Sequence, residues 1–271
     1  EAGFFPWLAT EVAHFVHGTT PPALRAALYG ARQAPLLRAG GGLRPIAAGD
    51  TFRRIAAKFL ARSVAGEAAR LLSDVGQIGV GVAGGAEGMA FAARQMVSSW
   101  AGMSGKAAVK IDLRNAFNVV DRSALLAEVA AHFPSLLPYA TAAYGAPTLL
   151  AFGDADLFSA AGVQQGDPLG PLFFALVMRR VWMRADGWAA AAGVSPLDVR
   201  AAYLDDLFFG GDVDATRAYF DFFSDAAAEV GLELNQRKFE VISEDPECLA
   251  RFPDISTHRS TASWELLGTP C

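Results

Sequence analysis

Two aspartates lie side by side in an otherwise apolar stretch of this 271-residue chain: Asp205 and Asp206, within the run VRAAYLDDLFFGGD at positions 199–212. Carboxylates next to buried surface lose solvation, and neighbouring like charges repel each other. A third carboxylate, Asp112, closes a separate apolar run, KAAVKID. If the two runs are neighbouring strands of one sheet, the three carboxylates converge at its edge.

Such a cluster stays ionised only with bound cations, because like charges a few ångströms apart raise one another's pKa. Magnesium takes one or two carboxylates together with water and substrate phosphates. Two ions roughly 3.5–4 Å apart can activate an attacking hydroxyl and neutralise the leaving oxygen of a phosphoryl transfer. The three aspartates therefore indicate metal-assisted phosphoryl transfer.

The tetrapeptide Tyr-x-Asp-Asp alone would occur by chance in roughly a few per cent of chains this long, so the surrounding elements decide its meaning. A strand is predicted over 106–113, and a pair of short strands with the aspartates at their bend over 199–211. Three glycines, 40 to 42, predict a tight hairpin. Apolar periodicity predicts helices over 50–72, 86–100, 121–133, 167–185 and 214–231. Strands and helices mix without regular alternation, which favours the α+β fold class.

The composition is that of a globular protein, with 52% hydrophobic and 19% charged residues. Its two cysteines, Cys248 and Cys271, lack partners at metal-ligand spacing, which argues against a disulfide framework and a zinc site. No basic region precedes the first apolar stretch, and no apolar run approaches the roughly 20 residues of a membrane helix. We therefore expect an intracellular protein without a signal peptide, a transmembrane segment or a membrane partner.

The net charge of −5 hides an asymmetry, because residues 25–70 hold nine basic side chains against only Asp50 and Glu67. A basic part joined to an acidic part suits a protein that holds a polyanion with one and metal ions with the other. A solvated basic helix face is the alternative.

Two further patterns resemble known binding loops but lack residues that those loops require. The glycines of GVGVAGG at 79–85 match a dinucleotide-binding loop, but the preceding residues are a poor strand, and the next acidic residue after the opening turn of the helix is Asp112. A turn or a close backbone approach explains these glycines better. The run from Asp212 begins like a calcium loop, but Arg217 stands where the turn requires glycine.

Seven blocks in order, from about residue 35 to the end, resemble the fingers and palm of reverse transcriptases, most closely those of non-LTR retrotransposons and more distantly those of group II introns. GGLRPIAAGDTFRRIAAKFLAR and QIGVGVAGGAEGM resemble fingers segments, VKIDLRNAFNVVDR the first catalytic palm segment, and GVQQGDPLGPLFFAL the glutamine–glycine segment. YLDD resembles the second catalytic segment, GLELNQRKFE the lysine-bearing segment and WELLGTP the primer-grip hairpin.

The resemblance implies a role for each matching residue. Asp112 and Asp205 would bind two Mg²⁺ ions, for which Mn²⁺ is a possible substitute, with the Leu113 carbonyl as a further ligand and Asp206 in support. Lys238 would lie near the pyrophosphate as a proton donor or an electrostatic clamp. The remaining candidates face the nucleotide: Arg38 and Arg44 grip the triphosphate, Gln165 and Gly166 line the nucleotide and template side, and Phe117 excludes a 2′-hydroxyl.

Some assignments stay open at this point. On spacing alone, an aromatic residue at position 117 is more often part of helix or core packing, and the steric-gate role is implied only by the resemblance. Arg53, Arg54 and Lys58 could contact template or form a solvated helix face. Phe239 stands where the family usually has cysteine, a departure that we expect to affect only packing.

The resemblance also divides the chain. It implies right-hand polymerase fingers over 1–106 and 122–160, a palm with an antiparallel sheet on helices over 107–121 and 161–271, and no thumb, endonuclease, RNase H or zinc-knuckle segment. The expected function is RNA-directed DNA polymerase, a nucleotidyltransferase, with an RNA template, a DNA or RNA primer and dNTPs as partners and a nuclear ribonucleoprotein as one possible setting. Alternatives are an RNA-dependent RNA polymerase and an inactive retroelement remnant that only binds nucleic acid.

Overall fold

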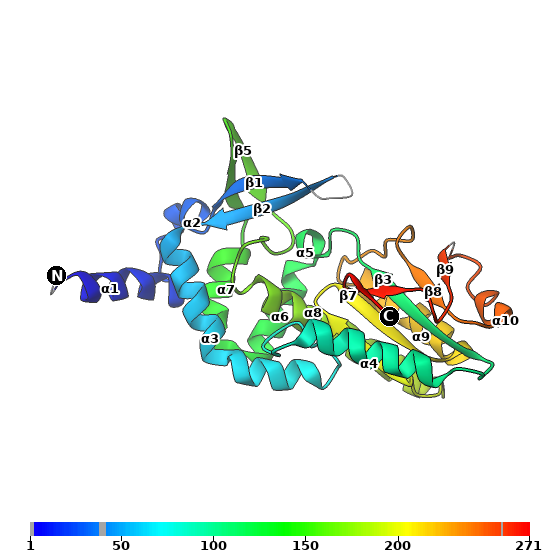
Figure 1. Ribbon diagram of the computed structural model, residues 1–271. Coiled ribbons are helices and arrows are strands. Elements are labelled where there is room, and N and C mark those ends of the chain that lie inside the picture. The colour runs from blue at the N-terminus through cyan, green and yellow to red at the C-terminus, as the bar shows by residue number, and fades with distance from the viewer. Residues whose placement is uncertain (1–2, 38–41, 256) are drawn as a thin grey trace. The chain divides into compact units, whose positions relative to one another are not determined.

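The chain forms eleven strands and ten α-helices within residues 3–37, 42–255 and 257–271, which are the residues described by its computed structural model (Figure 1). The expected α+β class is confirmed, because helices and antiparallel strand pairs follow one another in irregular order. Two compact units are built from alternating segments of the chain: residues 1–65 with 117–177, and residues 66–116 with 178–271.

The first unit holds a four-stranded sheet in the order β2-β1-β4-β5. Its two hairpins are joined by a parallel pairing of β1 with β4, and helix α2 contacts β4. Its elements are α1 (Phe4–Val16), α2 (Pro22–Leu28), β1 (Ala31–Leu37), β2 (Leu43–Gly49), the start of α3 (Thr51–Ser73), α5 (Ala116–Val119), α6 (Arg122–His132), η1 (Pro134–Leu136), α7 (Leu137–Tyr144), β4 (Thr148–Phe152), β5 (Ala155–Ser159) and the start of α8 (Gly170–Ala191).

The second unit holds a five-stranded sheet in the order β6-β7-β3-β8-β9, in which β3 pairs antiparallel with both β7 and β8. The predicted strand ending on Asp112 and the predicted strand pair around the aspartates are therefore neighbours. The elements are α4 (Gly85–Ser99), β3 (Lys106–Asp112), β6 (Val199–Tyr203), β7 (Asp206–Asp212), α9 (Val213–Ala228), β8 (Glu240–Ile242), α10 (Pro246–Leu249), β9 (Thr257–Arg259) and a separate hairpin of β10 (Glu265–Leu266) with β11 (Thr269–Pro270).

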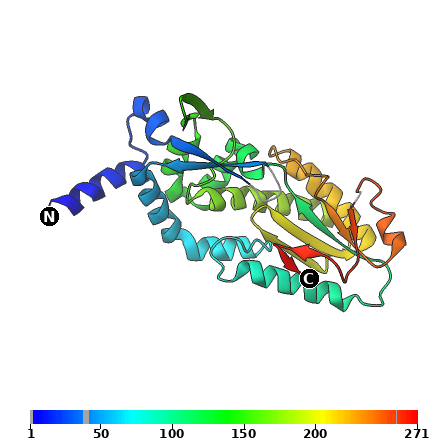
Figure 2. The ribbon, with the colours of Figure 1, turned by 45° about the horizontal axis from the view of Figure 1, so that its top comes forward.

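Alternation along the strands gives this sheet two apolar faces. Phe208, Ala108 and Ile242 belong to a core that α4 and the C-terminal hairpin cover, and Phe208 stacks on Trp264 at 5.2 Å between ring centroids. On the opposite face Phe209 packs against rings of α8 and α9 (Figures 1 and 2). Because both faces are covered, the sheet is a fixed platform for the residues at its ends.

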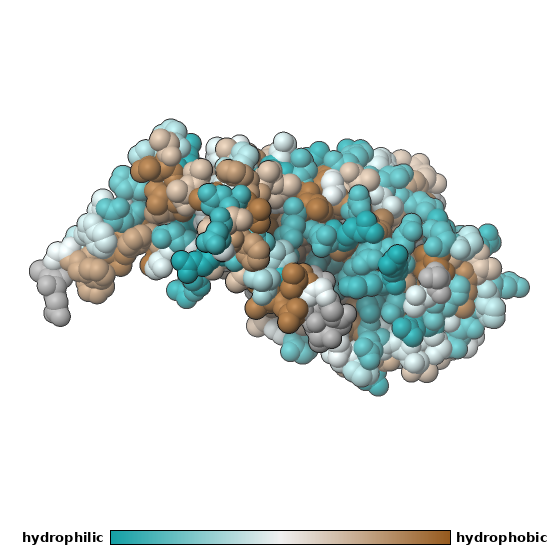
Figure 3. Space-filling model, turned by 90° about the horizontal axis from the view of Figure 1, so that it is seen from above, coloured by the Kyte–Doolittle hydropathy of each residue, from teal (hydrophilic) through white to brown (hydrophobic). Residues whose placement is uncertain are grey.

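Helix α1 carries apolar side chains at its surface. Phe4, Phe5 and Trp7 are all about half exposed or more, and Figure 3 shows hydrophobic residues on this helix. Trp7 packs edge-on against Phe52 of α3, and Phe15 is buried against Tyr29. No helix in the described part of the chain is both long and apolar enough to cross a membrane.

Replacing the buried Phe209 by alanine should lower the free energy of unfolding by about 3–5 kcal/mol, because it removes a ring from a closed aromatic cluster and leaves a cavity. Chemical denaturation measures the change. The matched control is Phe91→Ala on α4, where the ring is 64% exposed and the change should stay within about 0.5 kcal/mol. Equal losses in the two variants would contradict this account of the sheet.

Candidate active site

The pairing of β3 with β7 brings two of the three predicted carboxylates together. Asp112 lies directly opposite Asp206 at the end of the ladder, and Asp206 also pairs with Tyr203 across the β6–β7 hairpin. Asp205 stands in the tight turn between those two strands, next to Leu204. Among the described residues, no three acidic, histidine or cysteine side chains are close enough to form a metal site. The strand register brings two carboxylates together, those of Asp112 and Asp206.

Asp112 is held by the segment GLELNQRKFE, in which the sequence patterns singled out Lys238 but not Asn235. The Asn235 side chain donates to Oδ2 of Asp112 at 2.8 Å, and the Asn235 backbone N–H donates to the Asp112 carbonyl at 2.8 Å. Leu113 forms an isolated bridge with Leu234. Lys238 contacts the other carboxylate oxygen, Oδ1, with its Nζ at 3.3 Å. Lys238 thus lies beside Asp112, while its expected role at a pyrophosphate stays a prediction, and Asn235 is an additional residue of the site.

Asp206 is the carboxylate whose ionisation the fold opposes. Burial, and then the charges of Asp205 and Asp112, raise its pKa to about 6 from an ordinary value near 3.8, while Lys110 and Lys238 act in the opposite direction. A cation near the pair would relieve this cost. Oxygen ligands from one or two carboxylates, completed by water and phosphate, are what Mg²⁺ uses in proteins, so the pair fits that ion.

The turn that carries Asp205 has a strained backbone fixed by a buried glutamine. Leu204 has a positive φ of 58°, which is costly for a residue with a side chain. Gln77 is fully buried, accepts from the Leu204 N–H at 2.8 Å and donates to the Leu204 carbonyl at 3.1 Å. Gly79 lies so close that a Cβ there would approach the Leu204 nitrogen to 2.7 Å. The glycine-rich segment is thus a close backbone approach, as the sequence analysis favoured, and it supports the aspartate turn.

The candidate nucleotide-contacting residues belong to the first unit. Phe117 stacks on the buried Phe174 with centroids 4.5 Å apart, and its ring is only half buried. Gln165 is half buried and Gly166 is exposed. Arg44 is exposed on β2, and Arg38 lies outside the described residues.

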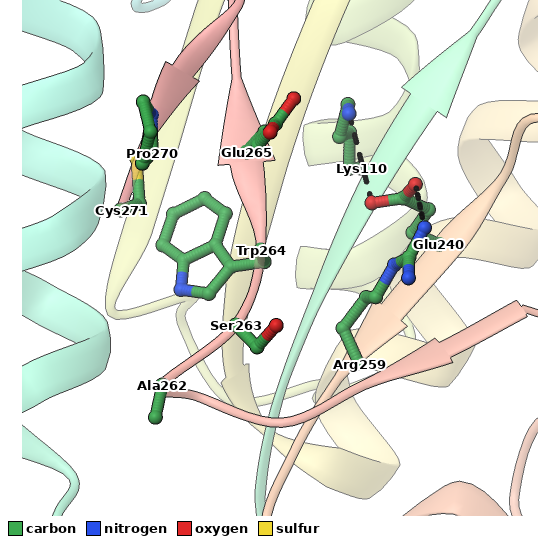
Figure 4. A pocket seen from close by; sticks show the side chains of 9 residues that line it. All are labelled: Lys110, Glu240, Arg259, Ala262, Ser263, Trp264, Glu265, Pro270 and Cys271. Carbon is green, nitrogen blue, oxygen red and sulfur yellow. Dashed lines mark hydrogen bonds and ion pairs between the residues drawn. The ribbon is translucent and has the colours of Figure 1, made fainter.

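Next to the carboxylates, the second unit has a pocket of about 380 Å³ between the sheet and the C-terminal hairpin (Figure 4). Lys110, two residues before Asp112 on β3, forms an ion pair with Glu240, which Arg259 also contacts at 3.3 Å. Trp264 and Glu265 line the side formed by the hairpin. The predicted primer-grip segment therefore forms a hairpin beside the sheet that carries Asp112.

A family model and solved structures agree with this arrangement. Residues 86–270, which include all three aspartates and Lys238, match the family described as reverse transcriptase (RNA-dependent DNA polymerase). The chain therefore belongs to the reverse transcriptase family. Reverse transcriptase domains generally use divalent metal ions such as Mg²⁺. No curated protein sequence matches the chain significantly.

Among solved structures, the chain is similar to telomerase from Candida albicans in complex with a fragment of telomeric RNA, with a TM-score of 0.63 and 10% identity over 93% of this chain and 45% of that one. Apo telomerase from Candida tropicalis, truncated from its C-terminal domain, gives 0.60 and 13% over 83% and 51%. The RNA polymerase complex of a dsRNA virus gives 0.57 and 11% over 86% and 22%. The chain thus has the fingers-and-palm fold and spans about half the length of these telomerases.

Asp206→Asn should raise the melting temperature of the metal-free protein at pH 8. The pKa of the carboxyl is higher in the folded than in the unfolded protein, so stability falls as pH rises from about 4 to about 6, and the full loss is present above about 6. The gain should therefore shrink at pH 5. Thermal melts in chelator at both pH values measure it, with the exposed Asp225→Asn of α9 as the control. A gain of the same size at both pH values would contradict the assignment.

Gln77→Met should loosen the aspartate turn, because it leaves the Leu204 N–H and carbonyl without their buried partners at a cost of about 1–3 kcal/mol each. Hydrogen exchange of the amides at 203–206 should accelerate, while exchange in α9 stays unchanged. Adding Leu204→Gly should recover part of the stability, since glycine adopts a positive φ without strain. Unchanged hydrogen exchange in Gln77→Met would show that the turn keeps its conformation without the hydrogen bonds of Gln77.

Proposed function

We propose that the protein is an RNA-directed DNA polymerase of the non-LTR retrotransposon type, a nucleotidyltransferase that extends a DNA or RNA primer with dNTPs on an RNA template. The observation that carries the proposal is the register pairing of Asp112 with Asp206 beside the Asp205 turn, inside the segment that matches the reverse transcriptase family. Residues 1–106 and 122–160 serve as fingers in this proposal, and residues 107–121 and 161–271 as palm.

Asp112 and Asp205, with the Leu113 carbonyl, would hold two Mg²⁺ ions, and Asp206 would support them. The bound ions would lower the pKa of the primer hydroxyl and neutralise the leaving pyrophosphate. Asn235 orients Asp112 through its 2.8 Å hydrogen bond and leaves one carboxylate oxygen for Lys238 and a ligand. Lys238 is more than half exposed, which suits a side chain that turns from Asp112 to an incoming phosphate as proton donor or electrostatic clamp.

Phe117 acts as the sugar gate in this proposal. One face of its ring is fixed against Phe174, and its backbone carbonyl accepts from the Val163 N–H at 2.6 Å, so the ring cannot easily retreat. A fixed aromatic ring under the sugar leaves no room for a 2′-hydroxyl. This feature favours dNTPs over the ribonucleotides of an RNA-dependent RNA polymerase.

An exposed basic stripe on α3 supports an RNA partner. Arg54, Lys58 and Arg62 are spaced four residues apart, so they share one helix face with a rise of about 6 Å between them. No ion pair engages any of the three within the described residues, whereas Arg184, Arg200, Arg217, Arg251 and Arg259 in the second unit each pair with an acidic side chain. These three basic side chains lie beside the exposed side chains of Ile55 and Phe59. The basic groups could contact the phosphates of a single-stranded RNA while the apolar side chains contact its bases.

Primer extension by the full product of the gene on an RNA template, with Mg²⁺ and dNTPs, tests the proposal. Asp112→Asn and Asp205→Asn should each lower kcat by at least about 10²-fold, as loss of a charge-stabilising group at a reacting centre does. The exposed Asp225→Asn should extend primers like the wild type. Primer extension that survives Asp205→Asn would reject the assignment of these aspartates as metal ligands. A wild-type protein that binds RNA but never extends a primer would favour the alternative of an inactive retroelement remnant.

Phe117→Val should raise the efficiency with NTPs relative to dNTPs by roughly 10–200-fold, the effect of opening a pocket by a few carbon atoms. The ratio of kcat/KM for dTTP and UTP measures it. A wild type that already prefers NTPs would support the RNA-dependent RNA polymerase.

Changing Arg54, Lys58 and Arg62 together to glutamine should weaken single-stranded RNA binding and reduce the slope of log affinity against log salt by about 0.7 for each lost phosphate contact. Arg251→Gln, a similarly exposed arginine that pairs with Asp214, is the control and should leave the slope unchanged. An unaltered slope in the triple variant would make the stripe a solvated helix face.

A further inference from the structure

Arg53, next to the basic stripe in sequence, is not part of it. It is 2% exposed and forms an ion pair of 2.7 Å with Asp167, whose side chain is fully buried. Two charges buried together are stable only when further hydrogen bonds satisfy their remaining donors and acceptors. Arg53 therefore has a structural role in the interior and is neither solvated nor placed to contact a template.

The guanidinium reaches several segments at once. Nη1 donates to Oε1 of Gln164 at 2.6 Å, to the Tyr29 carbonyl and to the Gly30 carbonyl at 3.3 Å, while Nε donates to the Tyr139 hydroxyl at 3.3 Å. These partners come from the α2–β1 connection, from α7 and from the loop before α8. Arg53 thus joins parts of the first unit that lie up to 114 positions apart in sequence.

Asp167 is satisfied as fully as its partner. It accepts from the Tyr144 hydroxyl at 2.7 Å, from the Tyr139 hydroxyl at 3.3 Å and from the Leu169 N–H at 2.9 Å. Burial, the largest single effect, lowers the pKa of Arg53, but Asp167, Tyr139 and Tyr144 together outweigh it and raise that pKa. The Arg53 guanidinium therefore stays charged in the interior.

The turn at residues 164–167 has buried ends and a more exposed middle. Gln164 and Asp167, the outer two, are buried and bound by Arg53, whereas Gln165 is half exposed and Gly166 is exposed. The arginine therefore grips both ends of a turn whose middle faces outward.

The middle of the turn is tied to strand β2. The Ala47 N–H donates to the Gln165 carbonyl at 2.6 Å. Gly166 has a φ of 131°, and a Cβ there would approach the Ala47 carbonyl oxygen to 2.4 Å, so only glycine fits. Arg53 fixes the two ends of the turn, and Ala47 of β2 contacts its middle, so these contacts together define the conformation of the turn.

We infer that Arg53 is a positioning residue that sets the placement of Gln165 and Gly166 toward the nucleotide by clamping Gln164 and Asp167. The role of Gln165 and Gly166 toward nucleotide rests on the proposed function, whereas the clamp itself is read from the geometry. A planar guanidinium offers donors in several fixed directions, which a lysine ammonium on a flexible stem does not reproduce.

The test compares Arg53→Lys with Arg70→Lys, the same substitution at an exposed position of α3 that has no part in the proposed RNA contact. Arg53→Lys keeps the charge but loses the fork, so amides at 163–167 and at Ala47 should exchange hydrogen faster than in the wild type, independent of any activity. The KM for dNTP should rise about 10–100-fold, as with other residues that orient a binding group, with a smaller change in kcat. Arg70→Lys should change neither quantity.

Tyr144→Phe gives a gentler probe if Arg53→Lys fails to fold, because it removes only the 2.7 Å hydrogen bond to Asp167 and keeps the ring. Faster exchange at 163–167 together with a higher KM would support the clamp. Faster exchange with an unchanged KM, or no change in exchange, would overturn it. A wild-type protein without polymerase activity would reject the proposed function, while the exchange data would still decide whether Arg53 holds the turn.

Discussion

The antiparallel pairing of β3 with β7 is the constraint on which the rest of the site depends. Seven consecutive residue pairs align the two strands, and the last of them sets Asp112 against Asp206. A slip of one residue would turn every side chain of a strand to the other face. Phe208 and Phe209, buried on opposite faces, make such a slip costly, because each would lose its own aromatic cluster. The hydrophobic core therefore specifies the carboxylate pair.

Within each unit, supporting side chains fix the candidate residues or their chain neighbours. In the second unit, Asn235 bonds to Asp112, and Gln77 bonds to Leu204, the residue before Asp205. In the first unit, Arg53 bonds to Gln164 and Asp167, which flank Gln165 and Gly166. These hydrogen bonds orient the candidate residues without a bound ligand, whereas burial and the neighbouring carboxylates oppose the ionisation of Asp206.

Sequence patterns predicted the α+β class, the strand ending on Asp112 and the strand pair around the aspartates, because these depend on local periodicity and on motif order. The supporting residues could not be predicted in this way. Arg53 occupies a helix position whose neighbours Arg54 and Lys58 are exposed, and only the packing of distant segments decides that it turns inward. Gln77 and Asn235 likewise act across 127 and 123 positions of sequence.

The contact of Gly166 with Ala47 limits where the β1–β2 hairpin can bend. Its base is tied down at Ala47 by the hydrogen bond to Gln165 and at Gly30 by Arg53, whereas the strands beyond Pro45 and Pro35 are mostly exposed. The outer described residues, among them Arg44, therefore have fewer anchors than the base that holds Gln165. In the proposed polymerase, Arg44 would then be free to adjust its hold on a triphosphate while Gln165 keeps its place beside the nucleobase.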